Sequence, residues 1–202
     1  METKTPSPAP VTISHDELMS FPILRYTGPV LLIRTAADLQ HFREVIRHEH
    51  VVGFDIETRP TFRKGQTHTP SVVQIGASRE VFIFQLAKLD CVHTLTEVFH
   101  NARLIKAGIA LSRDLLDLQK LFPIQPAGFV DLGDVASKNG LKQTGVRNLA
   151  GMFLHGRITK GAQTSNWAAP ELHQKQITYA ATDAWVCREL YVHFEKLGWL
   201  KS

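Results

Sequence analysis

Two acidic residues stand two positions apart at the end of a short apolar segment. They are Asp55 and Glu57, and the segment covers residues 51–57. Side chains alternate between the two faces of a strand, so both carboxylates should point to the same side. Like charges this close repel each other unless something positive lies between them, and a divalent metal ion would supply that charge. The alternative is a strand end that emerges into solvent.

A tyrosine and an aspartate stand four residues apart near the C-terminus. Tyr179 and Asp183 lie in a segment that is predicted to be helical, where this spacing places them on one face, one turn apart. The small residues around them, Ala180, Ala181 and Ala184, would let the helix approach another element closely. The alternative interpretation is a core tyrosine and a surface aspartate.

A further acid, Asp114, stands early in a predicted helix, six residues after Gly108. An aspartate at a helix start is usually a surface residue that the helix dipole favours. Asp117, one turn later, is equally suited to be the exposed acid of this helix.

The apolar pattern predicts the elements that must position these groups. Strands are expected at 30–33, 51–57, 72–77, 81–84, 104–107 and 129–132. The short gap between 72–77 and 81–84 predicts an antiparallel hairpin. Helices are expected at 37–46, 92–100 and 146–154, and at 171–197 before Gly198. A further helix is expected after an N-cap at Ser112, with Leu115, Leu116, Leu118 and Leu121 on its apolar side. This order predicts an α/β domain with a mixed sheet covered by helices.

The composition excludes several classes of protein. The chain has 202 residues, of which 44% are hydrophobic and 21% charged, so one globular domain is expected rather than disorder. The two cysteines, Cys91 and Cys187, have no metal or CxxC spacing. There is no membrane-length apolar run, and the start METKTPSPAP lacks the apolar core of a signal peptide, so a cytoplasmic protein without a membrane partner is expected. Residues 1–20 are expected to form a flexible tail.

Taken in order, the acidic positions resemble the three motifs of the DEDDy 3′–5′ exonucleases, the group that includes ribonuclease D and the exonuclease domain of the Werner syndrome helicase. The motifs are Phe54-Asp55-Ile56-Glu57-Thr58, Gly108-x5-Asp114 and Tyr179-x3-Asp183. Flanking stretches fit as well, namely Val73-Gln74-Ile75-Gly76, Ser165-Asn166-Trp167 and Gln176-x2-Tyr179. The resemblance covers about residues 30–198, and Tyr179 places the chain in the tyrosine branch.

The resemblance implies a ribonuclease-H-like mixed β-sheet flanked by helices, with an exonuclease domain over residues 21–202. It also implies two bound divalent ions, Mg²⁺ or Mn²⁺. Carried over to this sequence, Asp55 would bridge both ions, and Glu57 and Asp183 would hold the ion that binds the attacking water. Asp114 would hold the second ion, partly through water, and Tyr179 would orient the water.

Several other residues are candidates for contact with nucleic acid: Thr58, Arg59, Lys64, Lys160 and Trp167. The basic ones would contact backbone phosphates or are simply exposed charges. Trp167 could stack on a base, although a core or hinge role is the favoured interpretation. The net charge of +4 permits a polyanionic partner without requiring one.

The leading hypothesis is a metal-dependent exonuclease that acts on nucleic acid with a free 3′ end and releases 5′-mononucleotides. DNA is slightly favoured over RNA, because the chain ends at Ser202 without the C-terminal helical domains usual in ribonuclease D-like chains. The alternatives are an RNA 3′-end-trimming exoribonuclease and a non-catalytic nucleic-acid-binding domain on the same fold. A cofactor-binding α/β enzyme is disfavoured, because the sequence has neither a GxGxxG before a helix nor a GxxxxGK[ST].

Overall fold

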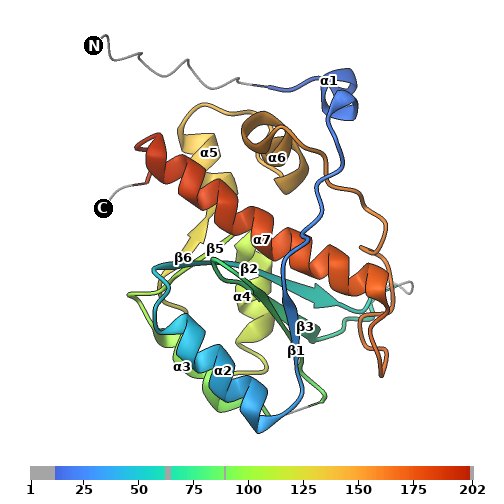
Figure 1. Cartoon of the computed structure of the whole chain (residues 1–202), viewed down its shortest axis with the longest axis vertical. Coiled ribbons are helices and arrows are strands. Elements are labelled where there is room, and N and C mark those ends of the chain that lie inside the picture. The colour runs from blue at the N-terminus through green and yellow to red at the C-terminus, as the bar shows by residue number, and fades with distance from the viewer. Residues whose placement is uncertain (1–11, 62–64, 89, 201–202) are drawn as a thin grey trace.

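The computed structural model describes residues 12–61, 65–88 and 90–200. Within them, the strands form one mixed sheet in the order β1-β4-β3-β2-β5-β6 (Figure 1). The strands are β1 (Val30–Ile33), β2 (Val51–Thr58), β3 (Pro70–Gly76), β4 (Val81–Gln85), β5 (Ile105–Gly108) and β6 (Phe129–Asp131). β2 is central, antiparallel to β3 and parallel to β5, and β3 and β4 form the predicted antiparallel hairpin.

Helices cover both faces of the sheet (Figure 1). One face carries α2 (Ala36–Ile46), α3 (Val92–His100) and α4 (Leu111–Leu118), and the other carries α5 (Leu132–Lys138), α6 (Val146–Leu154) and α7 (Gln174–Lys196). The predicted mixed sheet flanked by helices is therefore confirmed. No helix in the described part of the chain combines the length and hydrophobicity that a membrane span requires.

Buried apolar clusters fill the space on both faces. On the α2–α4 face, Val52, Phe54 and Ile56 of β2 belong to one cluster. On the other face, two clusters join the strands to α5, α6 and α7. β2 thus sends its large apolar side chains to one face and leaves Asp55 and Glu57 for the face that α7 covers, as strand alternation predicted.

α7 approaches the centre of the sheet so closely that no side chain fits between them. A Cβ atom on Gly53 of β2 would lie 1.7 Å from the Ala184 carbonyl oxygen. A Cβ atom on Gly76 of β3 would lie 3.0 Å from the Ala184 carbonyl carbon. Ala180, Ala181 and Ala184 are all fully buried. The expectation that small residues allow this helix to approach another element is confirmed.

The ends of α7 follow from local hydrogen bonds. The helix begins at Gln174 rather than at 171, because His173 donates its backbone N–H to the Gln176 side chain at 3.0 Å and so caps the first turn. It ends at Lys196. Gly198 adopts a φ of 70°, the left-handed conformation of a residue that terminates a helix, which confirms its predicted role.

The predicted tail is corrected from Ile13 onward. The structure has a short helix there, α1 (His15–Ser20). Ile13 and Leu18 are buried against the α6 side of the domain, and the Ile13 N–H donates to the Gln143 side chain at 2.8 Å. Residues 1–11, the rest of the predicted tail, lie outside the described residues.

α4 differs from its prediction at its start and on its apolar side. Ala110, in the left-handed conformation at φ 59°, takes the N-cap position that was predicted for Ser112. Leu118 is buried, but Leu116 and Leu121 are 57% and 36% exposed, so only part of the leucine side packs against the core. A non-glycine residue holds a positive φ only where its surroundings enforce it.

Asp131 organises the starts of two helices. Its Oδ2 accepts a hydrogen bond from the Leu111 N–H of α4 at 2.8 Å, and its Oδ1 accepts one from the Gly133 N–H of α5 at 2.9 Å. The strand predicted at 129–132 therefore ends at Asp131, and α5, which was not predicted, begins at Leu132.

The contact between Gly53 and α7 makes a stability prediction. Gly53→Ala places a methyl group against the Ala184 carbonyl, which the helix backbone cannot easily avoid, so the free energy of unfolding should fall by about 2 kcal/mol or more in urea denaturation. The matched control is Gly161→Ala, because nothing lies within 4 Å of a Cβ atom built there. Equal denaturation midpoints for the two variants would contradict the close approach.

Candidate active site

Three carboxylates meet between the end of β2 and α7. Asp55 and Glu57 come from β2 and Asp183 comes from α7, and one oxygen of each lies within 4.8 Å of the other two. Glu57 and Asp183 are buried, with 9% and 6% of their surface exposed, and Asp55 is half-buried. Asp183 Oδ1 is buried and has no hydrogen-bond partner among the described residues. The structure thus joins the first and third predicted motifs into one site.

Burial makes this group electrostatically unfavourable when it is ionised. Burial raises the pKa of Asp55 well above its usual range, and the charges of Asp183 and Asp114 raise it further. Burial, followed by the charge of Asp55, raises the pKa of Glu57 to about 10. Burial raises the pKa of Asp183 to about 7, although the neighbouring Tyr179 hydroxyl opposes the shift.

The donor set fits a hard divalent cation. Mg²⁺ and Mn²⁺ prefer oxygen ligands, and a cation would compensate the repulsion between the three carboxylates. Asp183 Oδ1 is a buried acceptor that still lacks a partner within the described structure, as a ligand atom for such an ion would. Asp55, Glu57 and Asp183 could therefore bind a metal ion together.

Gln74 orients one of these carboxylates. It stands opposite Asp55 in the antiparallel β2–β3 pair, and its Nε2 donates to Asp55 Oδ2 at 3.3 Å. Gln74 is completely buried. In the sequence, Gln74 stands out only as part of the stretch Val73-Gln74-Ile75-Gly76 that flanks the first motif. The signal that could have identified it is the register of the antiparallel β2–β3 pair, which places Gln74 on the same face as Asp55.

Asp114 of α4 lies beside the three carboxylates but outside their group. Its oxygens are not among those within 4.8 Å of one another. Its charge nevertheless raises the pKa of both Asp55 and Glu57, so it is near them. Burial, and then the charge of Asp117, raises the pKa of Asp114 itself to about 7. The fourth predicted acid therefore lies near the site without joining the group of three.

Asp117, the alternative acid of α4, is engaged elsewhere. Its carboxylate pairs with Arg113 at 2.9 Å and with Lys120 at 2.5 Å. Hydrogen bonds from Lys120 and Arg113 lower the pKa of Asp117. Of the two aspartates in this helix, Asp114 is thus the one whose charge acts on the carboxylate group.

Tyr179 joins the apolar core to the acidic group. Its ring is half-buried and packs near Trp167, with the ring centroids 6.1 Å apart. Burial, together with the charges of Asp183 and Glu57, raises the pKa of the Tyr179 hydroxyl. The phenol therefore stays protonated at neutral pH and can donate a hydrogen bond within the site.

The stretch before α7 has a structural explanation. Gln176 Nε2 donates to Ser165 Oγ at 3.0 Å and to the Asn166 carbonyl at 3.2 Å, which ties this loop to the first turn of α7. Trp167 is only 1% exposed and belongs to an apolar cluster beneath α7. The suggestion that Trp167 stacks on a base is therefore corrected, because its ring faces are covered, and the core interpretation is confirmed.

The other candidates for nucleic-acid contact stay predictions. Thr58 is half-buried at the end of β2, next to the acids, and Arg59 follows it on the surface. Lys160 is exposed in the loop that precedes α7. Lys64 lies outside the described residues.

Comparison with known proteins agrees with this geometry. A family model described as 3′-5′ exonuclease matches residues 30–199. The chain therefore belongs to the 3′-5′ exonuclease family, which confirms the resemblance drawn from its motifs.

Two curated relatives and one solved structure are similar to this chain. It is 28% identical over 190 residues to the bifunctional 3′-5′ exonuclease/ATP-dependent helicase WRN of Mus musculus, covering 89% of this chain and 14% of that protein. It is 31% identical over 170 residues to ribonuclease D of Gluconacetobacter diazotrophicus, covering 82% of this chain and 42% of that protein. The chain thus spans less than half the length of either relative.

The solved structure is the EXO domain of Aedes aegypti Nibbler. It superposes with a TM-score of 0.74 at 23% identity, covering 83% of this chain and 87% of that one. This similarity confirms the predicted ribonuclease-H-like fold.

The raised pKa values make the stability of the metal-free protein depend on pH. Asp183 and Asp114 have folded pKa values of about 7, above those of the unfolded chain, so the native state binds more protons between about pH 4 and 7. Stability should be greatest below this window and fall as pH rises through 7. We expect the Tm of metal-free protein to decrease from pH 5 to pH 8, and Mg²⁺ or Mn²⁺ to raise it more at pH 8. A thermal shift assay measures both effects.

Removing one of the repelling charges tests the same electrostatics. Asp183→Asn should raise the Tm of metal-free protein at pH 8 and remove most of the stabilisation by Mg²⁺ or Mn²⁺. Glu44→Gln, which removes the same charge from the exposed surface of α2, should change neither property. An unchanged metal response in Asp183→Asn would show that this carboxylate does not bind the ion.

Proposed function

We propose that this chain hydrolyses phosphodiester bonds one nucleotide at a time from the 3′ end of a nucleic acid, releasing 5′-mononucleotides with the help of two divalent ions, Mg²⁺ or Mn²⁺. The observation that carries the proposal is the convergence of three carboxylates with raised pKa values, two of them buried and one half-buried, beside a protonated tyrosine. Membership of the 3′-5′ exonuclease family supports it.

The acids divide into two sets of metal ligands in this proposal. Asp55, Glu57 and Asp183 would hold one ion, and Asp55 with Asp114 would hold the other. When bound, the two ions supply an activated oxygen nucleophile and stabilise the leaving 3′-oxyanion. This assignment is consistent with Asp114 lying near the other three acids but outside their group.

The side chains of the chain itself place the reacting groups. The Tyr179 hydroxyl, which stays protonated, donates a hydrogen bond that orients the attacking water towards the terminal phosphate. Gln74 fixes the position of Asp55 through its 3.3 Å hydrogen bond. The water oxygen bonds to phosphorus while the bond from phosphorus to the preceding 3′-oxygen breaks. No side chain forms a covalent intermediate.

DNA stays the slightly favoured substrate in this proposal, as expected from the sequence. The second candidate is RNA 3′-end trimming, which the 31% identity to ribonuclease D favours. Digestion of end-labelled single-stranded DNA, recessed duplex DNA and RNA side by side, with each metal, decides between them. Faster cleavage of RNA with both metals would replace the DNA assignment.

The exonuclease proposal predicts that Asp55→Asn abolishes cleavage. The amide cannot replace a carboxylate between two cations, so the nucleotide ladder from a 3′-hydroxyl substrate should disappear, as it should when EDTA is added to the wild type. The matched control is Asp117→Asn, which removes an ion-paired acid from α4 and should leave cleavage intact. Full activity of Asp55→Asn, in a preparation free of other nucleases, would refute the proposal. Binding without cleavage by the wild type, under all metals and substrates, would instead support a non-catalytic nucleic-acid-binding domain.

Tyr179→Phe should separate catalysis from metal binding. It removes one hydrogen-bond donor and keeps the ring against Trp167, so kcat should fall about 100-fold while the protein keeps its metal-dependent Tm. Single-turnover cleavage and a thermal shift assay give the two readouts. A kcat equal to that of the wild type would mean that the hydroxyl does not orient the water.

A further inference from the structure

A cavity lies far from the acidic site, between α2, α3 and the loop that leads into β5. Its volume is about 500 Å³, within the usual size range of ligand sites. It adjoins the residues just before β2 and β5, whereas Asp55 and Glu57 stand at the other end of β2. An eight-residue strand is roughly 25 Å long. The cavity is also on the sheet face opposite α7, so it is separate from the active site.

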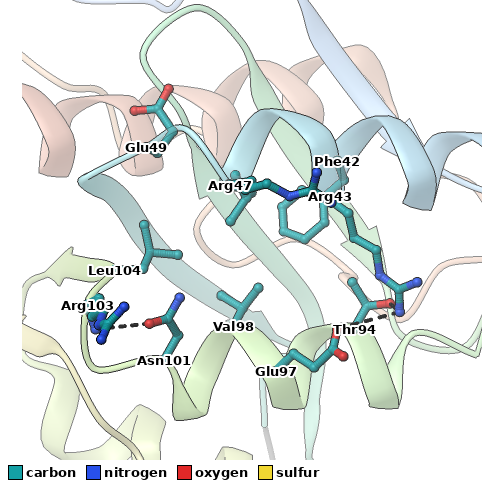
Figure 2. A pocket seen from close by; sticks show the side chains of 11 residues that line it. Phe42, Arg43, Arg47, Glu49, Thr94, Glu97, Val98, Asn101, Arg103 and Leu104 are labelled. Carbon is teal, nitrogen blue, oxygen red and sulfur yellow. Dashed lines mark hydrogen bonds and ion pairs between the residues drawn. The ribbon is translucent and has the colours of Figure 1, made fainter.

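The floor of this cavity is apolar. Phe42, Ile46, Val98 and Leu104 line it, and each of them is at most 8% exposed. Figure 2 shows Val98 and Leu104 around an open centre, with Phe42 behind. Such a floor can receive an apolar or planar group of a ligand.

Three arginines line the cavity from two sides. Arg43 lies in α2 and Arg47 directly follows the end of this helix, and Arg103 comes from the α3–β5 loop across the opening (Figure 2). Arg43 is already engaged, since its guanidinium donates to Thr94 Oγ1 at 2.8 Å and lies 3.6 Å from Glu97.

The other two arginines have no such partner. No carboxylate in the described structure lies within ion-pair distance of the Arg47 or Arg103 guanidinium, and both residues are exposed. The cavity therefore presents two cations that are free to bind a ligand.

The acids around the cavity are occupied. Glu49 accepts hydrogen bonds from the Ser78 N–H and hydroxyl and lies 3.8 Å from Arg188. Glu97 pairs with Arg43 and with His93, the latter at 3.3 Å. Neither carboxylate neutralises Arg47 or Arg103, so the cavity keeps a local excess of positive charge.

We propose that this cavity binds a phosphomonoester dianion, with its phosphate between Arg47 and Arg103 and its sugar or base on the apolar floor. Guanidinium groups bind phosphate oxygens through paired charge-assisted hydrogen bonds, and two such groups match the two charges of a phosphomonoester. Free 5′-mononucleotides and 5′-phosphorylated strand ends both carry this group. If the bound mononucleotide is the product of the exonuclease reaction, that part of the inference rests on the proposed function. The binding site itself does not depend on the proposed function.

Binding of adenosine 5′-monophosphate to metal-free protein tests the site. At pH 8 and without metal, Asp114 and Asp183 are mostly ionised and repel phosphate, so calorimetry reports the distal cavity. We expect one bound nucleotide per chain and at least about tenfold weaker binding of adenosine, which lacks the phosphate. Amide NMR shifts should be concentrated in α2 and around Leu104. Equal affinity for adenosine, or shifts around Asp183 alone, would overturn the proposal.

Substitution of the two free arginines is the second arm. Arg47→Gln with Arg103→Gln should weaken binding of the nucleotide at least about tenfold. Arg79→Gln, which removes one exposed arginine outside the cavity, should leave it unchanged. Arg47 and Arg103 are both exposed, so the double variant should fold, and its Tm verifies this. Wild-type affinity in the folded double variant would overturn the proposal.

Three further comparisons identify the source of the phosphate and separate this inference from the exonuclease proposal. A tetranucleotide with a 5′-phosphate that binds as tightly as the mononucleotide points to a strand end, and weaker binding points to the free nucleotide. An acidic peptide that binds more tightly than either would overturn the proposal in favour of a protein partner. Asp55→Asn should bind the mononucleotide like the wild type, because Asp55 lies outside the cavity. If the wild type binds the mononucleotide but cleaves no substrate, the exonuclease proposal is refuted and the cavity proposal stands.

Discussion

The contact of α7 with the middle of β2 is the constraint on which the acidic site depends. Gly53 leaves no room for a side chain below Ala184, and the alanines of α7 keep the helix surface flat. Only at this distance does Asp183 come close enough to Asp55 and Glu57 for the three carboxylates to offer one ligand atom each to a single metal site. The small residues thus have a functional consequence, because they set the separation of carboxylates that belong to different elements.

The same contact creates an electrostatic cost that the rest of the fold must offset. Three carboxylates are held where burial raises the pKa of each of them. Burying like charges opposes folding, so the apolar clusters on both faces of the sheet must supply the net stability. Repulsion between the carboxylates destabilises the site without cations, and bound cations would remove this repulsion. Functional sites often break the rule that like charges are kept apart, and the rest of the fold then supplies the missing stability.

β2 also separates two regions of opposite charge. Its C-terminal end carries the carboxylates, whereas the loops near its start adjoin the cavity with Arg47 and Arg103. Because a strand is stiff and both faces of β2 are packed, the two regions stay a strand length apart. A phosphate-bearing molecule would find attractive charge at the cavity in any state of the protein, but at the acids only after cations are bound.

The sequence by itself determined the elements whose pattern is local. Strand alternation placed Asp55 and Glu57 on one face, and helical spacing placed Tyr179 one turn from Asp183. The hairpin of β3 and β4, α3 and α6 were also predictable, because apolar periodicity and short turns are properties of neighbouring residues. The family motifs then connected Asp55, Asp114 and Asp183 across the chain.

Only the tertiary structure decided the features that depend on distant contacts. Ala110 takes the N-cap position of α4 in a left-handed conformation. The next residue, Leu111, donates its N–H to Asp131, and the same aspartate is the N-cap of the unpredicted helix α5. The packing beneath α7 buries Trp167, and the position of α4 leaves Asp114 outside the group of three acids. Short helices, caps and side-chain burial depend on partners that lie far away in the sequence, and their positions are known only once the sheet and its helices are assembled.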